Sequence, residues 1–62
     1  MQNYFKRSAA KSFLIDCLNN AVDKLGRNNI QDIEKEALKV FKENGYKLGF
    51  LDIQDTLKNY FY

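Results

Sequence analysis

Apolar residues recur through the middle of the chain with the spacing of an amphipathic helix. Between residues 29 and 44 they return every three or four positions and so share one face of a helix. The residues on this face are Ile30, Ile33, Ala37, Leu38, Val40 and Phe41. Lysine and glutamate occupy the opposite face. This pattern predicts a helix over residues 29–44.

Residues suited to helix ends flank this central stretch. Asn28 or Asn29 is positioned to cap its start, because a short polar side chain there accepts a hydrogen bond from the first turn. Gly45 is positioned to end it, because glycine adopts the left-handed conformation that follows many helices. Such an ending often places apolar residues on either side of the glycine in contact. We therefore expect Phe41 to touch Tyr46.

A more apolar stretch precedes it and predicts a helix over residues 4–25, or one that begins only at Ser8; Gly26 ends it. Its apolar arc covers about 200° of the helical wheel. The arc contains Phe13, Leu14, Ile15, Cys17, Leu18, Ala21, Val22 and Leu25. A helix that touches two neighbours needs a narrower apolar face. We therefore expect part of this arc to be exposed, and we expect the chain to self-associate as a dimer through it.

The last stretch predicts a helix over residues 52–61, with Asp52 as the N-cap. Its apolar positions repeat with helical spacing and are Ile53, Leu57, Tyr60 and Phe61. Residues 45–51 are predicted to be a loop. Together the three stretches predict an all-α fold, a small three-helix bundle that forms a single domain over residues 1–62.

The composition argues against catalysis. The chain has no histidine, no tryptophan, no proline and one cysteine. One cysteine cannot form an internal disulfide, and without histidine it cannot complete a zinc site. Cys17 lies in the apolar arc with no base to activate it, which predicts a buried, inert thiol. Asp52 and Asp55 suit the positive end of a helix dipole and are too few to hold a hard cation. We therefore expect no enzymatic activity, no metal and no cofactor.

Charge gives a second, alternative hypothesis. Ten basic and eight acidic residues leave a net charge of +2, which is weak for binding nucleic acid or a membrane surface. The densest basic cluster is Lys6, Arg7 and Lys11, with Tyr4 and Phe5 beside it. Basic residues among aromatic ones are able to contact a nucleic-acid backbone and stack on bases. The alternative is therefore a dimeric nucleic-acid-binding regulator that uses the basic start of the first helix.

The location and source of the chain are inferred from composition. No stretch approaches the roughly 20 apolar residues of a membrane span, and no long apolar run follows the first residues as in a secretory signal peptide. These features favour a cytoplasmic location without a membrane partner. Frequent Lys, Asn, Ile, Tyr and Phe are typical of an AT-rich genome, such as that of a low-GC bacterium or its phage.

The leading hypothesis is a small non-enzymatic regulatory or inhibitory protein, encoded by a phage or mobile element. It would act by docking on a larger protein, by self-association as a homodimer, or by both. Aromatic residues at the chain ends and the edge of the first helix are the expected docking surface, because exposed apolar area marks interfaces. The predicted interface residues are Phe5, Phe13, Cys17, Tyr60 and Tyr62. No motif names the partner.

Overall fold

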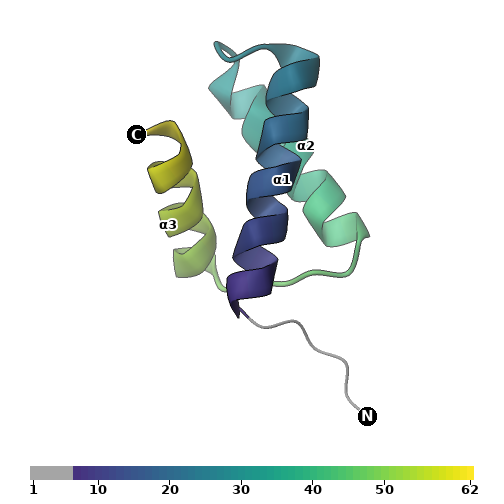
Figure 1. Cartoon of the computed structure of the whole chain (residues 1–62), viewed down its shortest axis with the longest axis vertical. Helices are drawn as coiled ribbons and strands as arrows, with labels where there is room; N and C mark the ends of the chain where they lie inside the picture. Colours follow the sequence, from purple (N-terminus) through teal and green to yellow (C-terminus); the bar gives the residue numbers. More distant parts are fainter. Residues whose placement is uncertain (1–6) are drawn as a thin grey trace.

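The computed structural model describes residues 7–62, which form three helices (Figure 1). The helices are α1 (Arg7–Leu25), α2 (Ile30–Glu43) and α3 (Phe50–Phe61). The predicted all-α three-helix bundle is confirmed. The predicted extension of the first helix back to residue 4 lies outside the described residues.

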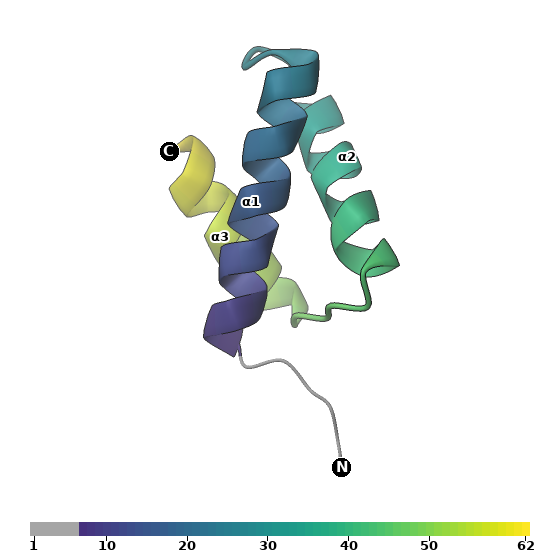
Figure 2. The same cartoon turned by 45° about the vertical axis from the view of Figure 1, so that its right-hand side comes forward.

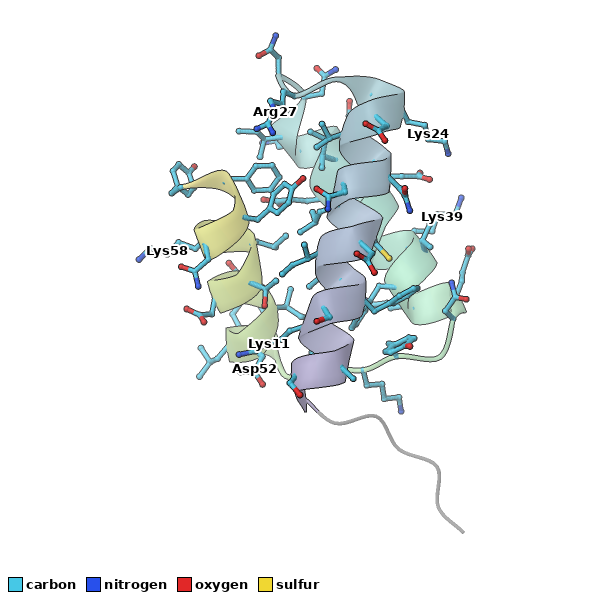
Figure 3. The ribbon with its side chains drawn as sticks, viewed as in Figure 1. Lys11, Lys24, Arg27, Lys39, Asp52 and Lys58 are labelled. Atoms are coloured by element: carbon cyan, nitrogen blue, oxygen red, sulfur yellow. The ribbon has the colours of Figure 1, made fainter. Side chains whose placement is uncertain are left out.

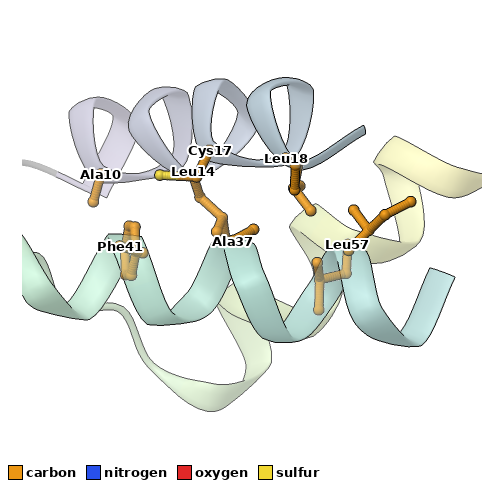
Figure 4. Close-up of a cluster of buried hydrophobic side chains, with 9 residues drawn as sticks. Ala10, Leu14, Cys17, Leu18, Ala37, Phe41 and Leu57 are labelled. Atoms are coloured by element: carbon orange, nitrogen blue, oxygen red, sulfur yellow. The ribbon is translucent and has the colours of Figure 1, made fainter. Parts of the chain in front are cut away.

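Helix α1 occupies the centre of the bundle. It packs closely along α2 and less extensively against α3, whereas α2 and α3 barely touch each other (Figures 1 and 2). The core lies mainly between α1 and α2 (Figure 4). Its buried apolar residues are Ala10, Leu14, Cys17, Leu18, Ala21, Ile33, Ala37, Phe41 and Leu57. Since α3 contributes only Leu57 to this set, it is held by less apolar burial than the other two helices.

The central position of α1 leaves only a small part of its apolar arc exposed, so the expected exposure is confirmed but is limited. Two neighbouring helices cover the arc from both sides, so Leu14 and Leu18 are fully buried and Phe13 is half-buried. Ile15 and Leu25, which are 40% and 37% exposed, are the most exposed apolar side chains of this arc. The apolar side chains with the largest exposed fractions therefore lie elsewhere.

In the turn between α1 and α2, the side chain of Asn29 forms a different hydrogen bond from the predicted one. Gly26 ends α1 with a φ of +84°, as predicted. Asn29 occupies the N-cap position of α2, also as predicted, yet its side chain makes no capping hydrogen bond there. Instead, its Nδ2 atom donates to the Leu25 carbonyl oxygen at 2.9 Å and closes the end of α1. An ion pair of 3.1 Å between Lys24 and Glu36 also joins the two helices.

The end of α2 forms the predicted glycine motif. Gly45 has a φ of +83° and donates its N–H to the Lys42 carbonyl oxygen at 2.9 Å. Tyr46 donates its N–H to the Phe41 carbonyl oxygen at 3.3 Å, which completes a Schellman motif. The rings of Phe41 and Tyr46 lie 5.6 Å apart, so the predicted contact is confirmed. Phe13 stacks on Tyr46 at 4.3 Å and ties this turn to α1.

The prediction that Asp52 caps α3 is wrong. The helix begins at Phe50, with Gly49 at the N-cap in an extended conformation. Glycine is an accepted N-cap because its small size leaves the first turn open to water. Asp52 instead lies in the first turn, where its carboxylate is 3.8 Å from the Lys11 ammonium of α1 (Figure 3). Its carbonyl oxygen accepts a 2.8 Å hydrogen bond from the hydroxyl of buried Thr56.

Candidate docking surface

The most exposed large apolar side chains of the described chain belong to α3 and its C-cap. Phe50, Leu51 and Tyr62 are 72%, 79% and 93% exposed. Every other exposed large apolar side chain among residues 7–62 is at most 40% exposed. Such a concentration on one short element, in a chain with a small core, is typical of an interaction surface.

Helix α3 has two faces of opposite character. Its inner face packs towards α1 through Ile53, Thr56, Leu57 and Tyr60, which are buried or half-buried. On the opposite side of the helix, four other residues follow one another at intervals of four, three and four positions. This spacing places all four on one face of the helix. This set, termed here the outer stripe, consists of Leu51, Asp55, Lys58 and Tyr62, all of which are exposed. Figure 3 shows Lys58 projecting from α3 away from α1.

An open groove of about 700 Å³ runs beside the outer stripe. It exists because α2 and α3 barely touch, so the side chains of α3 that face α2 are not covered by it. All four residues of the outer stripe line the groove, together with Phe61 of α3 and Glu34 of α2. The surface is therefore apolar towards both ends of α3 and carries charges of both signs between them.

The two charged residues of the outer stripe are available to a partner. Asp55 and Lys58 form no ion pair with another described residue. They lie three residues apart on one helix, with Leu51 before them and Tyr62 after them. An acidic group and a basic group side by side favour a partner that presents the complementary pair, and they disfavour one of a single charge sign.

The structure separates the two predicted tyrosine anchors. Tyr62 lies on the outer stripe and is almost fully exposed. Tyr60 is half-buried, and its hydroxyl donates a 2.6 Å hydrogen bond to the Asn19 Oδ1 atom of α1. The Tyr60 ring also packs edge-on against Phe61 at 5.1 Å. Tyr60 therefore holds α3 in place, whereas Tyr62 is free to contact a partner.

The other predicted interface residues do not join this surface. Phe13 is half-buried and stacked against Tyr46 beside the core, and Cys17 is only 4% exposed. Burial, and to a smaller extent the charge of Asp16, raises the pKa of the Cys17 thiol. The burial predicted for this thiol is thus confirmed, and its small exposed area offers little contact to a partner. Phe5 lies outside the described residues.

The predicted basic cluster is only partly described. Lys6 lies outside the described residues, as does the side chain of Arg7. Lys11 is half-buried, and its ammonium group lies 3.8 Å from the Asp52 carboxylate. The nearby negative charge compensates part of the positive potential that a phosphate backbone would require.

Sequence reasoning missed Phe50 and Leu51 because it placed them in a loop. Two signals pointed to the correct helix start. Gly49 is itself an acceptable N-cap, and a helix that includes Leu51 gives the outer stripe its regular spacing.

The chain matches no protein-family model and shows no significant similarity to a curated protein or a solved structure. Within residues 7–62, no three His, Cys, Asp or Glu side chains gather as they would around a metal ion. None of the described helices has both the length and the apolar character required to cross a membrane.

Proposed function

We propose that this protein is a small non-enzymatic regulator or inhibitor that acts by docking on another protein through the outer stripe of α3. The observation that carries the proposal is the exposure of Leu51 and Tyr62, 79% and 93%, at the two ends of one helical face. Complete burial of a large apolar side chain contributes about 1.5–3 kcal/mol, so covering two of them favours association. Tyrosine is also a frequent interface anchor, because it offers a large contact area with few rotatable bonds.

The chemistry of the side chains supports docking over catalysis. The chain lacks histidine, and its one thiol is buried with a raised pKa. A nucleophilic cysteine needs the opposite, namely access to solvent and a lowered pKa. The proposed activity therefore requires no cofactor and no metal, and its specificity comes from the shape and charge of the α3 surface.

The proposed setting follows from composition. Residue usage suits an AT-rich genome, and we place the protein in the cytoplasm of a low-GC bacterium, as the product of a phage or mobile element. A short chain that lacks catalytic groups is suited in this setting to block or redirect a larger host protein by occupying its surface.

Capture from a lysate of the native host tests the proposal. The wild-type chain, a Leu51→Ser variant and a Leu25→Ser control are immobilised, and bound proteins are identified by mass spectrometry. Leu25 is an exposed leucine of α1 that does not line the α3 groove, so the control repeats the chemical change at another site. We expect wild type and control to retain the same protein and Leu51→Ser to lose it. Equal retention by Leu51→Ser, with unchanged helical circular dichroism, would refute docking through α3.

The nucleic-acid alternative is tested separately. If Lys6, Arg7 and Lys11 contact phosphates, binding to non-specific duplex DNA should weaken steeply as salt concentration rises. The Lys11–Asp52 pair argues against this behaviour, and we expect no such binding at low salt.

A further inference from the structure

We infer that the outer stripe of α3 binds a second copy of this chain, with the two α3 helices packed antiparallel about a two-fold axis. The inference rests on the proposed docking function and assigns one occupant to its surface. It also moves the proposed self-association away from α1, because α2 and α3 cover most of the apolar arc of that helix and leave only Ile15 and Leu25 exposed.

The order of residues along the outer stripe fits a two-fold axis. The outer stripe is symmetric in sequence about the point between Thr56 and Leu57. Leu51 and Tyr62 lie at equal distances on either side of this point, and so do Asp55 and Lys58. A two-fold axis through it brings Leu51 of one copy to Tyr62 of the second copy and Asp55 to Lys58 of the second copy. Each contact then forms twice, as an isologous interface requires. Steps of four, three and four residues are also the spacing of a coiled-coil seam.

Charge selects the antiparallel arrangement over the parallel one. In the antiparallel register each Asp55 carboxylate faces the Lys58 ammonium of the second copy, which gives two attractive pairs. In a parallel, in-register pair, Asp55 would face Asp55 and Lys58 would face Lys58. Juxtaposed like charges disfavour an interface, so the same side chains favour one orientation and oppose the other.

The apolar residues close the seam at both ends. Leu51 covers the ring of Tyr62 of the second copy, so each apolar contact shields one flank of the two central ion pairs from water. Phe61 and Glu34 form the wall of the groove beside the seam. The contact of one short helix with another buries less area than a standard interface. We therefore expect a weak dimer whose population depends on concentration.

A charge-exchange experiment tests the pairing. Asp55→Lys leaves two basic groups in the stripe, and Lys58→Asp leaves two acidic groups. In a dimer of either variant alone, the side chain at position 55 of each copy therefore faces a like charge at position 58 of the other copy. A mixture of the two variants restores opposite charges at both positions of the mixed dimer. Since mixing changes no interaction within either chain, the comparison isolates the contact between copies. Circular dichroism of each variant confirms that it retains its helices.

Sedimentation equilibrium up to millimolar concentration provides the readout. We expect wild type to dimerise, each single variant to associate about tenfold or more weakly, and the equimolar mixture to recover association. A mixture no better than its components, or single variants that dimerise like wild type, would overturn the antiparallel register. A wild type that stays monomeric throughout would overturn the dimer itself. Loss of a captured host protein by Leu51→Ser would in that case still support docking on a different partner.

Discussion

The Tyr60 hydroxyl donates a 2.6 Å hydrogen bond to the Asn19 Oδ1 atom and so joins the last turn of α3 to the middle of α1. Helix α3 adds one residue, Leu57, to the buried apolar core. This hydrogen bond is therefore a sizeable part of the contact that holds α3 against α1. We expect Tyr60→Phe to lower the free energy of unfolding by about 0.5–1.5 kcal/mol. Urea unfolding measures the change. Tyr62→Phe removes a hydroxyl from an exposed ring and serves as the control. An equal decrease in the free energy of unfolding for Tyr62→Phe would contradict the stabilising role of the Tyr60–Asn19 hydrogen bond.

The inner and outer faces of α3 should respond differently to truncation. Leu57 is 5% exposed and Tyr62 is 93% exposed. We expect Leu57→Ala to destabilise the fold by about 2–4 kcal/mol, because it removes buried methyl groups and leaves a cavity. Tyr62→Ser should change stability by less than about 0.5 kcal/mol. Both are measured by urea unfolding of dilute protein, where association does not contribute. A large effect of Tyr62→Ser would place that ring in the fold instead of at the docking surface.

Two glycines provide a matched test of the turn before α3. A side chain added at Gly45 or at Gly49 meets no atom within 4 Å, so steric contacts do not distinguish them. Gly45 has a φ of +83°, whereas Gly49 has a φ of −66°. We expect Gly45→Ala to cost about 1–2 kcal/mol because L-residues avoid the left-handed region. Gly49→Ala should stay within about 0.5 kcal/mol, since weaker capping is offset by lower entropy of the unfolded chain. Equal midpoints in thermal unfolding would contradict this account.

Cys17 should react slowly with a thiol reagent in the native protein and rapidly in urea. Burial raises the pKa of its thiol, and the charge of Asp16 adds to this effect, so the reactive thiolate is scarce near neutral pH. A raised folded-state pKa also means that the folded state holds its proton more tightly than the unfolded state. The Cys17 thiol therefore contributes to the free energy of unfolding at pH values below the ordinary thiol pKa. This contribution is lost as the pH rises from that value through the raised pKa of the folded state. Native labelling as fast as in urea would show that the thiol is accessible.

The sequence predicted the helices and turns wherever one signal dominated. Ile33, Ala37 and Phe41 repeat on one face of α2, and Gly45 ends that helix with the predicted ring contact. The start of α3 was misplaced because two capping signals competed. Asp52 is the stronger N-cap by residue type, but Gly49 occupies that position and leaves Asp52 in the first turn, close to Lys11.

The proposed docking surface was less predictable, because exposure depends on how the helices assemble. The wide apolar arc of α1 suggested a large exposed surface, yet two neighbouring helices cover most of it because α1 takes the central position. The periodicity of α1 does not reveal how many neighbours it has. Tyr62, one of the predicted interface residues, is almost fully exposed. Leu51 was not predicted to be an interface residue, because the outer stripe becomes apparent only when α3 begins at Phe50.

The central claim is that the outer stripe of α3 is the docking surface, and amide chemical shifts test it most directly. Two-dimensional ¹H–¹⁵N spectra are recorded as the wild-type protein is diluted from millimolar to micromolar concentration. We expect concentration-dependent shifts at Leu51, Asp55, Lys58 and Tyr62, with the amides of α1 and of the α1–α2 turn unchanged. Shifts concentrated on α1, or spectra that do not change when either concentrated protein or a captured partner is present, would contradict it.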